Sequence, residues 1–237
     1  MCFSLGATAG MVVVGAVATA VAVRRGQPAA IPLTLAWFTL MEALQLGGYL
    51  TIDQCGNPVN QTVTWLSVLH IAFQPLFINA FALELMPAAV RARWRWPALM
   101  LSALAAAVML LQLAPLPFAG DCLPGTTLCG SPVCTRSGEW HLAWDIPRNG
   151  LFAGAVALWG NMASWPGYTL AVFVLPVFYG AWRFALFHAV VGPIAAGLLT
   201  DDPNEMPAIW CLFSIGITLI ALSPPLWRVF SPAAVRG

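Results

Sequence analysis

The sequence has no lysine and few charged residues of any kind. Its ten basic residues are all arginines, and charged residues make up only 8% of the 237-residue chain, whereas a soluble domain typically carries about 25%. The absence of lysine excludes a retinal Schiff base and a lysine nucleophile, because both need the lysine amine. A net charge of +1 gives no reason to expect an acidic partner such as a nucleic acid.

Apolar residues dominate what is present. They make up 60% of the chain, and the mean hydropathy is +0.81. Runs of roughly 17 to 25 apolar residues are long enough to cross a bilayer as helices. Seven such runs occur, at about residues 4–23, 30–51, 61–86, 97–117, 166–182, 184–199 and 206–227. The sequence therefore predicts an all-α bundle of seven transmembrane helices. We expect residues 1–237 to form a single integral membrane domain, and its partner is the lipid bilayer that surrounds it.

The first apolar run has an alternative interpretation as a secretory signal peptide. Ala18-Thr19-Ala20 resembles a cleavage site, but no basic residue precedes the apolar run, and Arg24-Arg25 follow it. Signal peptides carry their positive charge before the apolar region. We therefore interpret the run as a retained first span.

The arginines predict the orientation, because cytoplasmic loops of membrane proteins collect basic residues. With the N-terminus outside and the C-terminus in the cytoplasm, residues 118–165 form a long extracytoplasmic loop between helices 4 and 5. The segment 149–164 is also apolar enough to span, but a span there would move Arg228 and Arg236 outside, so we predict a re-entrant or interfacial piece. The arginines that fall inside in this orientation are Arg24, Arg25, Arg91, Arg93, Arg95, Arg183, Arg228 and Arg236.

The cysteines gather on the predicted outer side, at Cys2, Cys55, Cys122, Cys129 and Cys134. This placement favours an oxidising compartment and one or two disulfides. Four loop cysteines allow three pairings, and the sequence does not choose among them. The alanine-rich, arginine-rich, lysine-free composition is typical of GC-rich bacterial genes, which favours a bacterial inner membrane. If Met1 is removed, the amine and thiol of Cys2 could chelate a soft metal or take part in redox chemistry.

Polar residues interrupt two of the predicted spans. In "TWLSVLHIAFQPLF", residues 64–77, a turn of about 100° per residue places Ser67 and Gln74 within about 60° of His70, so the three form one stripe. In the second span, one side collects Phe38, Thr39, Glu42, Gln45 and Tyr49.

Depth links these residues to a third helix. At about 1.5 Å per residue, Glu42 and His70 lie roughly 13 Å below the outer boundary, and His188 on the sixth span lies at roughly 16 Å. We predict that these three side chains hold a transition metal (zinc, iron or copper), with Glu42 and His70 as catalytic residues. Residues expected to support the metal or contact a substrate are Gln45, Ser67, Gln74, His141, Asp145 and Cys211.

Three function classes remain open. The first is a metal-dependent membrane enzyme that acts on a lipid-like or small substrate. The second is a proton-coupled small-molecule transporter in which Glu42 and His70 carry protons, although the sequence shows no internal repeat of the kind many transporters have. The third is a ligand-binding or sensing protein without chemistry. The same polar residues could also form a hydrogen-bonded network that only holds helices together.

Two outer segments could close over the predicted site. In "EWHLAWDIP", residues 139–147, a helical turn would place His141 and Asp145 on one face. In "LLTDDPNEMPAIWCLFS", residues 198–214, Asp202 or Asn204 has the chemistry of a residue that starts the last helix.

The oligomeric state is not indicated by the sequence.

Three stretches, the opening "MCFS", "HIAFQPLFIN" and "LTDDPNEMPAIWCLFSIG", resemble a group of uncharacterised polytopic membrane proteins that begin with MCFS. The resemblance touches both ends and the middle of the chain, and it implies a shared fold and site but no established activity. Ser67 and His70 are also similar to the serine and histidine in an early helix of the seven-helix ceramidase and progestin-receptor-like membrane hydrolases. That superfamily has paired histidines in its last helix, which this sequence lacks, so the similarity is an analogy only.

Overall fold

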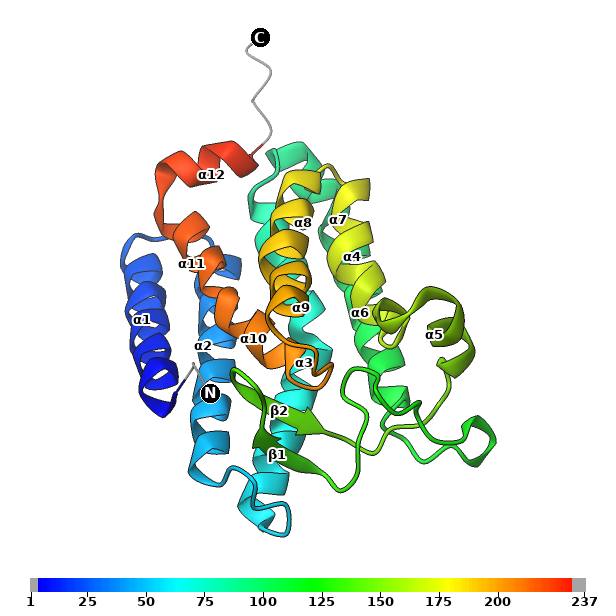
Figure 1. The fold of residues 1–237 in the computed structure, drawn as a ribbon. Coiled ribbons are helices and arrows are strands. Elements are labelled where there is room, and N and C mark those ends of the chain that lie inside the picture. The colour runs from blue at the N-terminus through cyan, green and yellow to red at the C-terminus, as the bar shows by residue number, and fades with distance from the viewer. Residues whose placement is uncertain (1–3, 232–237) are drawn as a thin grey trace.

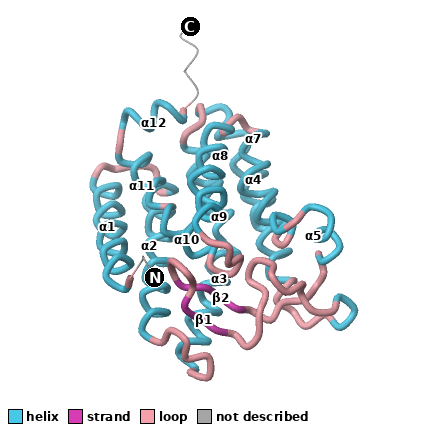
Figure 2. Tube along the Cα trace, viewed as in Figure 1, coloured by secondary structure: helices cyan, strands magenta, loops and turns pink. Residues whose placement is uncertain are grey.

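The structure is a computed structural model that describes residues 4–231, and it is mostly helical (Figures 1 and 2). Four long helices come first: α1 (Leu5–Arg24), α2 (Ala30–Leu50), α3 (Pro58–Glu84) and α4 (Ala88–Leu111). A long connection follows, with η1 (Pro117–Ala119), β1 (Cys134–Ser137), β2 (Leu142–Asp145), α5 (Ala153–Trp159) and η2 (Asn161–Ala163). The chain then returns through α6 (Pro166–Thr169), η3 (Leu170–Val174), α7 (Leu175–Phe178), α8 (Trp182–Ala189), η4 (Val190–Ile194), α9 (Ala195–Leu199), α10 (Met206–Phe213), α11 (Ile215–Leu222) and α12 (Pro224–Phe230).

Local chemistry sets several helix ends. The side chains of Ser4 and Asn57 cap the starts of α1 and α3 by accepting backbone N–H groups of the first turn, as such residues commonly do. Pro58 occupies the first turn of α3, where its missing N–H costs nothing. Gly26 follows α1 with φ of +64°, the left-handed conformation that ends many helices and that glycine adopts without strain.

Five of the described helices are long and apolar enough to cross a membrane: α1, α2, α3, α4 and the helix formed by α8, η4 and α9. The helix Pro166–Phe178 is shorter, because Gly180 with φ of +93° ends it before the predicted limit at residue 182. Residues 206–222 stop at Ser223 and bend by 101° into α12, where Pro224 and Pro225 begin a new helix. The seven predicted spans are therefore not all confirmed.

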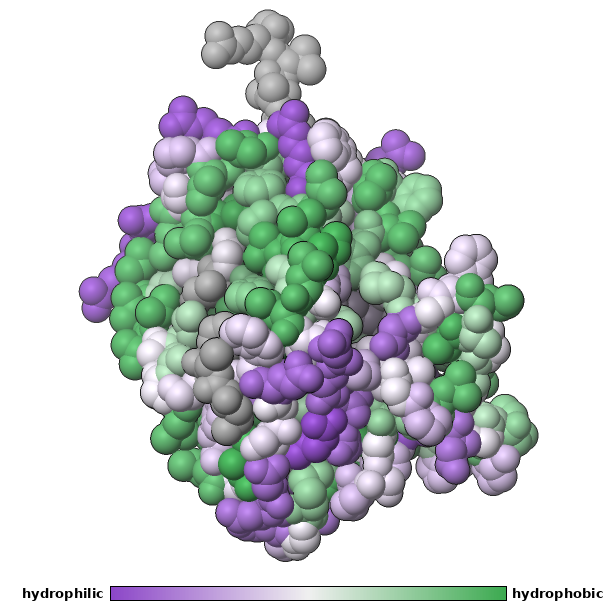
Figure 3. All heavy atoms as spheres, in the orientation of Figure 1, coloured by the Kyte–Doolittle hydropathy of each residue, from purple (hydrophilic) through white to green (hydrophobic). Residues whose placement is uncertain are grey.

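Large apolar side chains cover the outside of the helices. Figure 3 shows them over α8, α9 and α11, with hydrophilic residues over the β1–β2 hairpin and residues 200–205. Exposed apolar surface on this scale needs an apolar partner, and lipid is the partner that long apolar helices imply. The chain is a membrane protein on these grounds. More than half exposed are, for example, Val13, Leu33, Met100, Leu104, Phe178 and Leu219.

The two strands form an antiparallel pair with Cys134 opposite Asp145, so the predicted all-α class needs a correction in the 118–165 loop. Disulfides join Cys55 to Cys134 and Cys122 to Cys129, which selects one of the three possible pairings. We call the end of the bundle that carries these disulfides the hairpin end, and the opposite end the α12 end (Figure 1).

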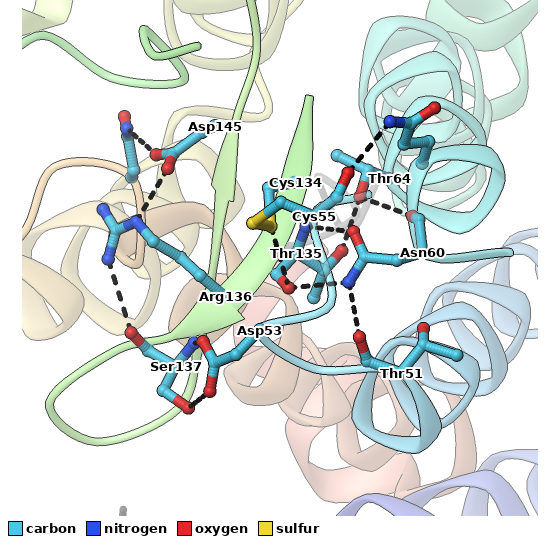
Figure 4. Close-up of a disulfide and its surroundings, with 12 residues drawn as sticks. Thr51, Asp53, Cys55, Asn60, Thr64, Cys134, Thr135, Arg136, Ser137 and Asp145 are labelled. Carbon is cyan, nitrogen blue, oxygen red and sulfur yellow. Dashed lines mark hydrogen bonds and ion pairs between the residues drawn. A yellow bond between two sulfur atoms is a disulfide. The ribbon is translucent and has the colours of Figure 1, made fainter. Parts of the chain in front are cut away.

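The disulfide fastens the hairpin to the connection between α2 and α3, and hydrogen bonds fasten it to α3 itself (Figure 4). The Asn60 amide donates to the carbonyl oxygens of Thr51 (2.7 Å) and Thr135 (2.8 Å), and its oxygen accepts the N–H of Thr135 (2.9 Å). The hydroxyls of Thr64 and Thr135 lie 2.7 Å apart. The carboxylate of Asp53 accepts the backbone N–H and the hydroxyl of Ser137. These contacts fix the hairpin on the ends of α2 and α3.

α3 is the most buried of the long helices and packs between α2 and α4. Asn79 ties it to its neighbours. Its amide nitrogen donates to the hydroxyl of Ser102 on α4 (3.0 Å) and to the carbonyl oxygen of Ala171 on η3 (2.9 Å), and its oxygen accepts the hydroxyl of Tyr179 (2.8 Å). Asn79 is thus a buried polar link among three segments, and sequence analysis did not identify it.

We expect Asn79→Leu to lower the free energy of unfolding by about 2 kcal/mol, because each interhelical hydrogen bond contributes about 0.6 kcal/mol on average and its former partners are left unsatisfied. Tyr179→Phe removes one of these bonds, so we expect a loss of about 0.6 kcal/mol. Unfolding of the purified protein in mixed micelles measures both. Equal losses in the two variants would contradict the linking role of Asn79.

Candidate functional site

The three predicted metal ligands are not grouped in the structure, and their surroundings differ. His70 donates from Nε2 to the carbonyl oxygen of Trp37 (2.7 Å) and stacks on the Trp37 ring, with centroids 4.4 Å apart. His188 accepts at Nε2 from the indole N–H of Trp210 (2.9 Å). Glu42 is buried with no hydrogen-bond partner in the structure. Within residues 4–231, no three His, Cys, Asp or Glu side chains are grouped so that they could hold a metal ion. The predicted metal site is therefore not supported, because equal depth did not bring the three helix faces together.

The stripe on α3 is partly assembled. The amide oxygen of Gln74 accepts the hydroxyl of Tyr168 (2.7 Å), and its nitrogen lies 3.5 Å from both Nδ1 of His70 and Sγ of Cys211. Ser67 does not join them, because its hydroxyl donates to a carbonyl oxygen one turn earlier in α3. His70 and Gln74 thus belong to one polar cluster with Tyr168 and the buried free thiol of Cys211.

A cavity of about 430 Å³ lies beside this cluster, between α3, α6, η4 and α10. Its polar groups include Gln74, Tyr168 and Cys211. The cavity reaches the surface where Met162 and Ile194 are about half exposed. The rest of the wall is mainly apolar and aromatic, with Ile71, Met109, Leu128, Trp165, Phe173, Pro193, Met206, Pro207 and Trp210. Of the predicted site residues that the structure describes, only Gln74 and Cys211 line this cavity.

A buried arginine stands behind one wall of the cavity. The guanidinium of Arg148 donates to Gln112 (3.3 Å) and to the hydroxyl of Thr126 (2.8 Å), and it lies 5.3 Å from the ring centroid of Trp165. Of the described residues, no carboxylate pairs with it. Burial lowers the pKa of Arg148 to about 10, so it is still charged at neutral pH. In the sequence, Arg148 and Arg136 are the two arginines that fall in the predicted extracytoplasmic loop, and neither was predicted to have a role at a site.

The hairpin contacts α2 through His141. Nε2 of His141 lies 2.5 Å from the amide oxygen of Gln45, and Nδ1 lies 2.5 Å from the hydroxyl of Tyr49. Burial lowers the pKa of His141 to about 4, so the imidazole is neutral, with Tyr49 donating to Nδ1 and Nε2–H donating to Gln45. The predicted helical turn that joins His141 to Asp145 is wrong, because residues 142–145 are strand β2 and the two side chains have different partners.

Residues 200–205 bind the hairpin. Asn204 donates to Asp145 (2.7 Å) and to the carbonyl oxygen of Cys129 (3.0 Å), and Arg136 pairs with both Asp145 (2.9 Å) and Asp202 (2.7 Å). The prediction that Asp202 or Asn204 starts the last helix needs correction, because α10 begins without a side-chain cap. Both predicted outer segments do lie together at the hairpin end. Cys2 lies outside the described residues.

Comparison with known proteins identifies a family but no activity. No curated protein and no solved structure matches the sequence, so the looser similarity to the ceramidase and progestin-receptor-like hydrolases gains no support. A family of unknown function, DUF5765, matches residues 6–231. Since this match covers nearly the whole chain, the protein belongs to the family of unknown function DUF5765.

Proposed function

We propose that this chain is a membrane protein that binds a small lipid-like molecule in the cavity beside Gln74. The observation that carries the proposal is the cavity itself, about 430 Å³ with a mainly apolar wall and a few hydrogen-bonding groups. Sites for small molecules commonly have volumes of about 300–1,000 Å³ and this same division of apolar wall and few polar groups. Of the three function classes that the sequence left open, this proposal follows the ligand-binding protein and not the metal-dependent enzyme.

The polar cluster indicates which end of the ligand it would meet. The amide nitrogen of Gln74 lies 3.5 Å from Nδ1 of His70, which is the outer limit of a hydrogen bond between nitrogen atoms, and 3.5 Å from Sγ of Cys211, which is a weak acceptor. Its N–H groups can therefore donate to a ligand oxygen at shorter distance. The hydroxyl of Tyr168 already donates to Gln74, so its oxygen is left to accept. This combination fits a hydroxyl head group, which both accepts and donates.

The proposal includes seven spans, formed by α1, α2, α3, α4, α6–α7, α8–α9 and α10–α11, with the hairpin end outside. Disulfides at the hairpin end favour an oxidising side, such as the periplasmic side of a bacterial inner membrane. Arg25 and Arg183 bond the carbonyl oxygens of Leu222 and Val229 near the α12 end, as expected for a cytoplasmic side. The exposed Leu158 and Trp159 of α5 suit an interfacial segment.

The enzyme and transport hypotheses have less structural support than ligand binding has. Among the described residues no three His, Cys, Asp or Glu side chains are grouped so that they could hold a metal ion, so a metal-dependent reaction has no assembled ligand set there. Catalytic or proton-carrying roles for Glu42 and His70 stay predictions. A lipid-like substrate remains compatible with the cavity, since binding precedes any reaction.

Photolabelling with a photoactivatable fatty alcohol tests where the ligand binds. We expect labelled peptides from residues 161–169, 189–194 and 206–211, which line the cavity. Ala189→Trp places an indole in the cavity and is expected to abolish this labelling. Ala107→Trp is the matched control, because Ala107 lies on the exposed face of α4 and does not line the cavity. The proposal would be contradicted if the Ala189→Trp and Ala107→Trp variants were labelled equally strongly.

Gln74→Leu tests the polar end of the cavity. We expect the affinity for the fatty alcohol to fall by about five- to tenfold, since a hydrogen bond contributes about 1 kcal/mol. The affinity for a photoactivatable hydrocarbon of equal length should stay unchanged, because it has no group that bonds to the amide. Competition labelling measures both affinities. A loss that is the same for alcohol and hydrocarbon would show that Gln74 shapes the cavity without binding a head group.

A further inference from the structure

A second, much smaller chamber lies around Glu42, between α1, α2, α10 and α11. Its volume is about 10 Å³, which is near the lower limit for holding one water molecule. The oxygen-bearing side chains on its wall are Glu42, Thr39, Ser214 and Thr218. Cys211 lines both this chamber and the large cavity, so its side chain separates the two.

The carboxyl group of Glu42 has no partner in this chamber. The residue is 6% exposed, and neither carboxyl oxygen has a hydrogen-bond partner in the structure. None of the ten described residues that line the chamber is basic, so none of them can act as counter-ion. An ionised carboxylate in such a place is costly unless something pairs with it.

Neither Thr39 nor Ser214 can supply the missing donors, and the hydroxyl of Thr218 does not bond the carboxyl group of Glu42. Thr39 donates its only hydroxyl hydrogen to the carbonyl oxygen of Leu35 (2.7 Å), and Ser214 donates its own to the carbonyl oxygen of Cys211. Toward the chamber both groups therefore present oxygen lone pairs. The wall therefore presents oxygen acceptors from Glu42, Thr39 and Ser214. Oxygen atoms with no donor between them are stabilised when a cation binds among them.

Two features hold these oxygens in place. A Cβ atom on Gly15 of α1 would lie 2.3 Å from Oγ1 of Thr39, so only glycine lets α1 pack this closely against the threonine. Ser214 is the single residue between α10 and α11, where it keeps right-handed helical backbone angles, and it lines the chamber from that position.

We propose that this chamber is a binding site for one sodium ion, with ligand oxygens from Glu42, Thr39 and Ser214. Oxygen-only ligands suit a hard cation rather than a soft metal. A single carboxylate neutralises a monovalent ion, whereas a divalent ion would leave a net positive charge in apolar surroundings. The small volume favours sodium over the larger potassium ion. The site is independent of the proposed lipid-like ligand and does not need it.

Thermal unfolding in detergent tests the site directly. Wild-type protein is compared in sodium chloride, potassium chloride and N-methyl-D-glucamine chloride at equal ionic strength. We expect Tm to rise with the logarithm of the sodium concentration, since an ion that binds only the folded state stabilises it, and to rise less in potassium. Radioactive sodium should bind at one ion per chain. The proposal would be overturned if the wild-type Tm were the same in sodium as in N-methyl-D-glucamine and no radioactive sodium bound. Glu42 would then be buried as a neutral, protonated side chain that needs no cation.

Variants show whether sodium binds in this chamber. Glu42→Gln keeps the size of the side chain and is expected to lower sodium affinity by at least about tenfold. Glu139→Gln makes the same change at an exposed residue and should bind sodium as the wild type does. Thr39→Val removes one ligand and is compared with Thr19→Val, which also loses a hydroxyl bonded to its own helix (2.8 Å) but does not line the chamber. Sodium binding that survives both Glu42→Gln and Thr39→Val would place the ion elsewhere and overturn the assignment.

Discussion

Replacing Cys55 and Cys134 together by serine is expected to lower the free energy of unfolding by about 4 kcal/mol, since a crosslink restricts the unfolded chain more when it closes a longer loop. The disulfide closes a separation of 79 residues that contains α3 and α4. It also fastens the hairpin over the end of α3, where Asn60 and Thr135 bond each other. Replacing both cysteines avoids a new free thiol that could pair wrongly.

The second disulfide is the matched control. Cys122 and Cys129 are only 7 residues apart, so the same double replacement is expected to cost about 2 kcal/mol. Unfolding in mixed micelles, with each variant measured beside the wild type, gives the two differences. If removing the Cys122–Cys129 disulfide lowered the free energy of unfolding more than removing Cys55–Cys134, loop length would not determine how much each disulfide stabilises the protein. Local packing around each disulfide would determine it instead.

The helices were predictable because their signal is strong and local. The apolar runs at 4–23 and 30–51 nearly coincide with α1 and α2, since a bilayer span requires a fixed length of apolar chain. Sequence analysis erred where backbone breaks decide the outcome, at Gly180 and Ser223, because apolar composition continues across both. The β hairpin was missed because its pairing depends on the Cys55–Cys134 crosslink and on contacts with α3, which lie far apart in sequence.

The candidate site was predictable only as a set of unusual residues. Glu42, His70 and Gln74 were singled out because polar groups in apolar spans are rare, and all three are buried. Depth along a helix says nothing about which face meets which neighbour, so the grouping of Glu42 with His70 and His188 did not follow. The cavity beside Gln74 is formed mainly by aromatic residues such as Tyr168 and Trp210, which look ordinary in an apolar sequence. Their role depends on packing among segments that the sequence does not relate.

Glu205→Gln is expected to lower the free energy of unfolding by about 3 kcal/mol, because a buried carboxylate that accepts several hydrogen bonds is replaced by a group that cannot accept them all. Glu205 is fully buried. Its carboxylate accepts the backbone N–H groups of Glu139 (3.0 Å), Trp140 (2.6 Å) and His141, and the hydroxyl of Thr200 (2.5 Å). It therefore holds the turn of the hairpin to the segment that leads into α10.

The exposed Glu139 provides the matched control within the same turn. Glu139→Gln changes the net charge equally but leaves the Glu205 carboxylate in place, so we expect a loss within about 0.5 kcal/mol. Hydrogen exchange of the Trp140 and His141 amides adds a local measurement, because both should exchange faster in Glu205→Gln. Since Trp144 also bonds the carbonyl oxygen of Asn204 (3.1 Å), the strand should stay attached while the turn loosens. Equal stability in the two variants, with unchanged exchange at the turn, would mean that the hairpin is held by its disulfide and by the Arg136 ion pairs instead.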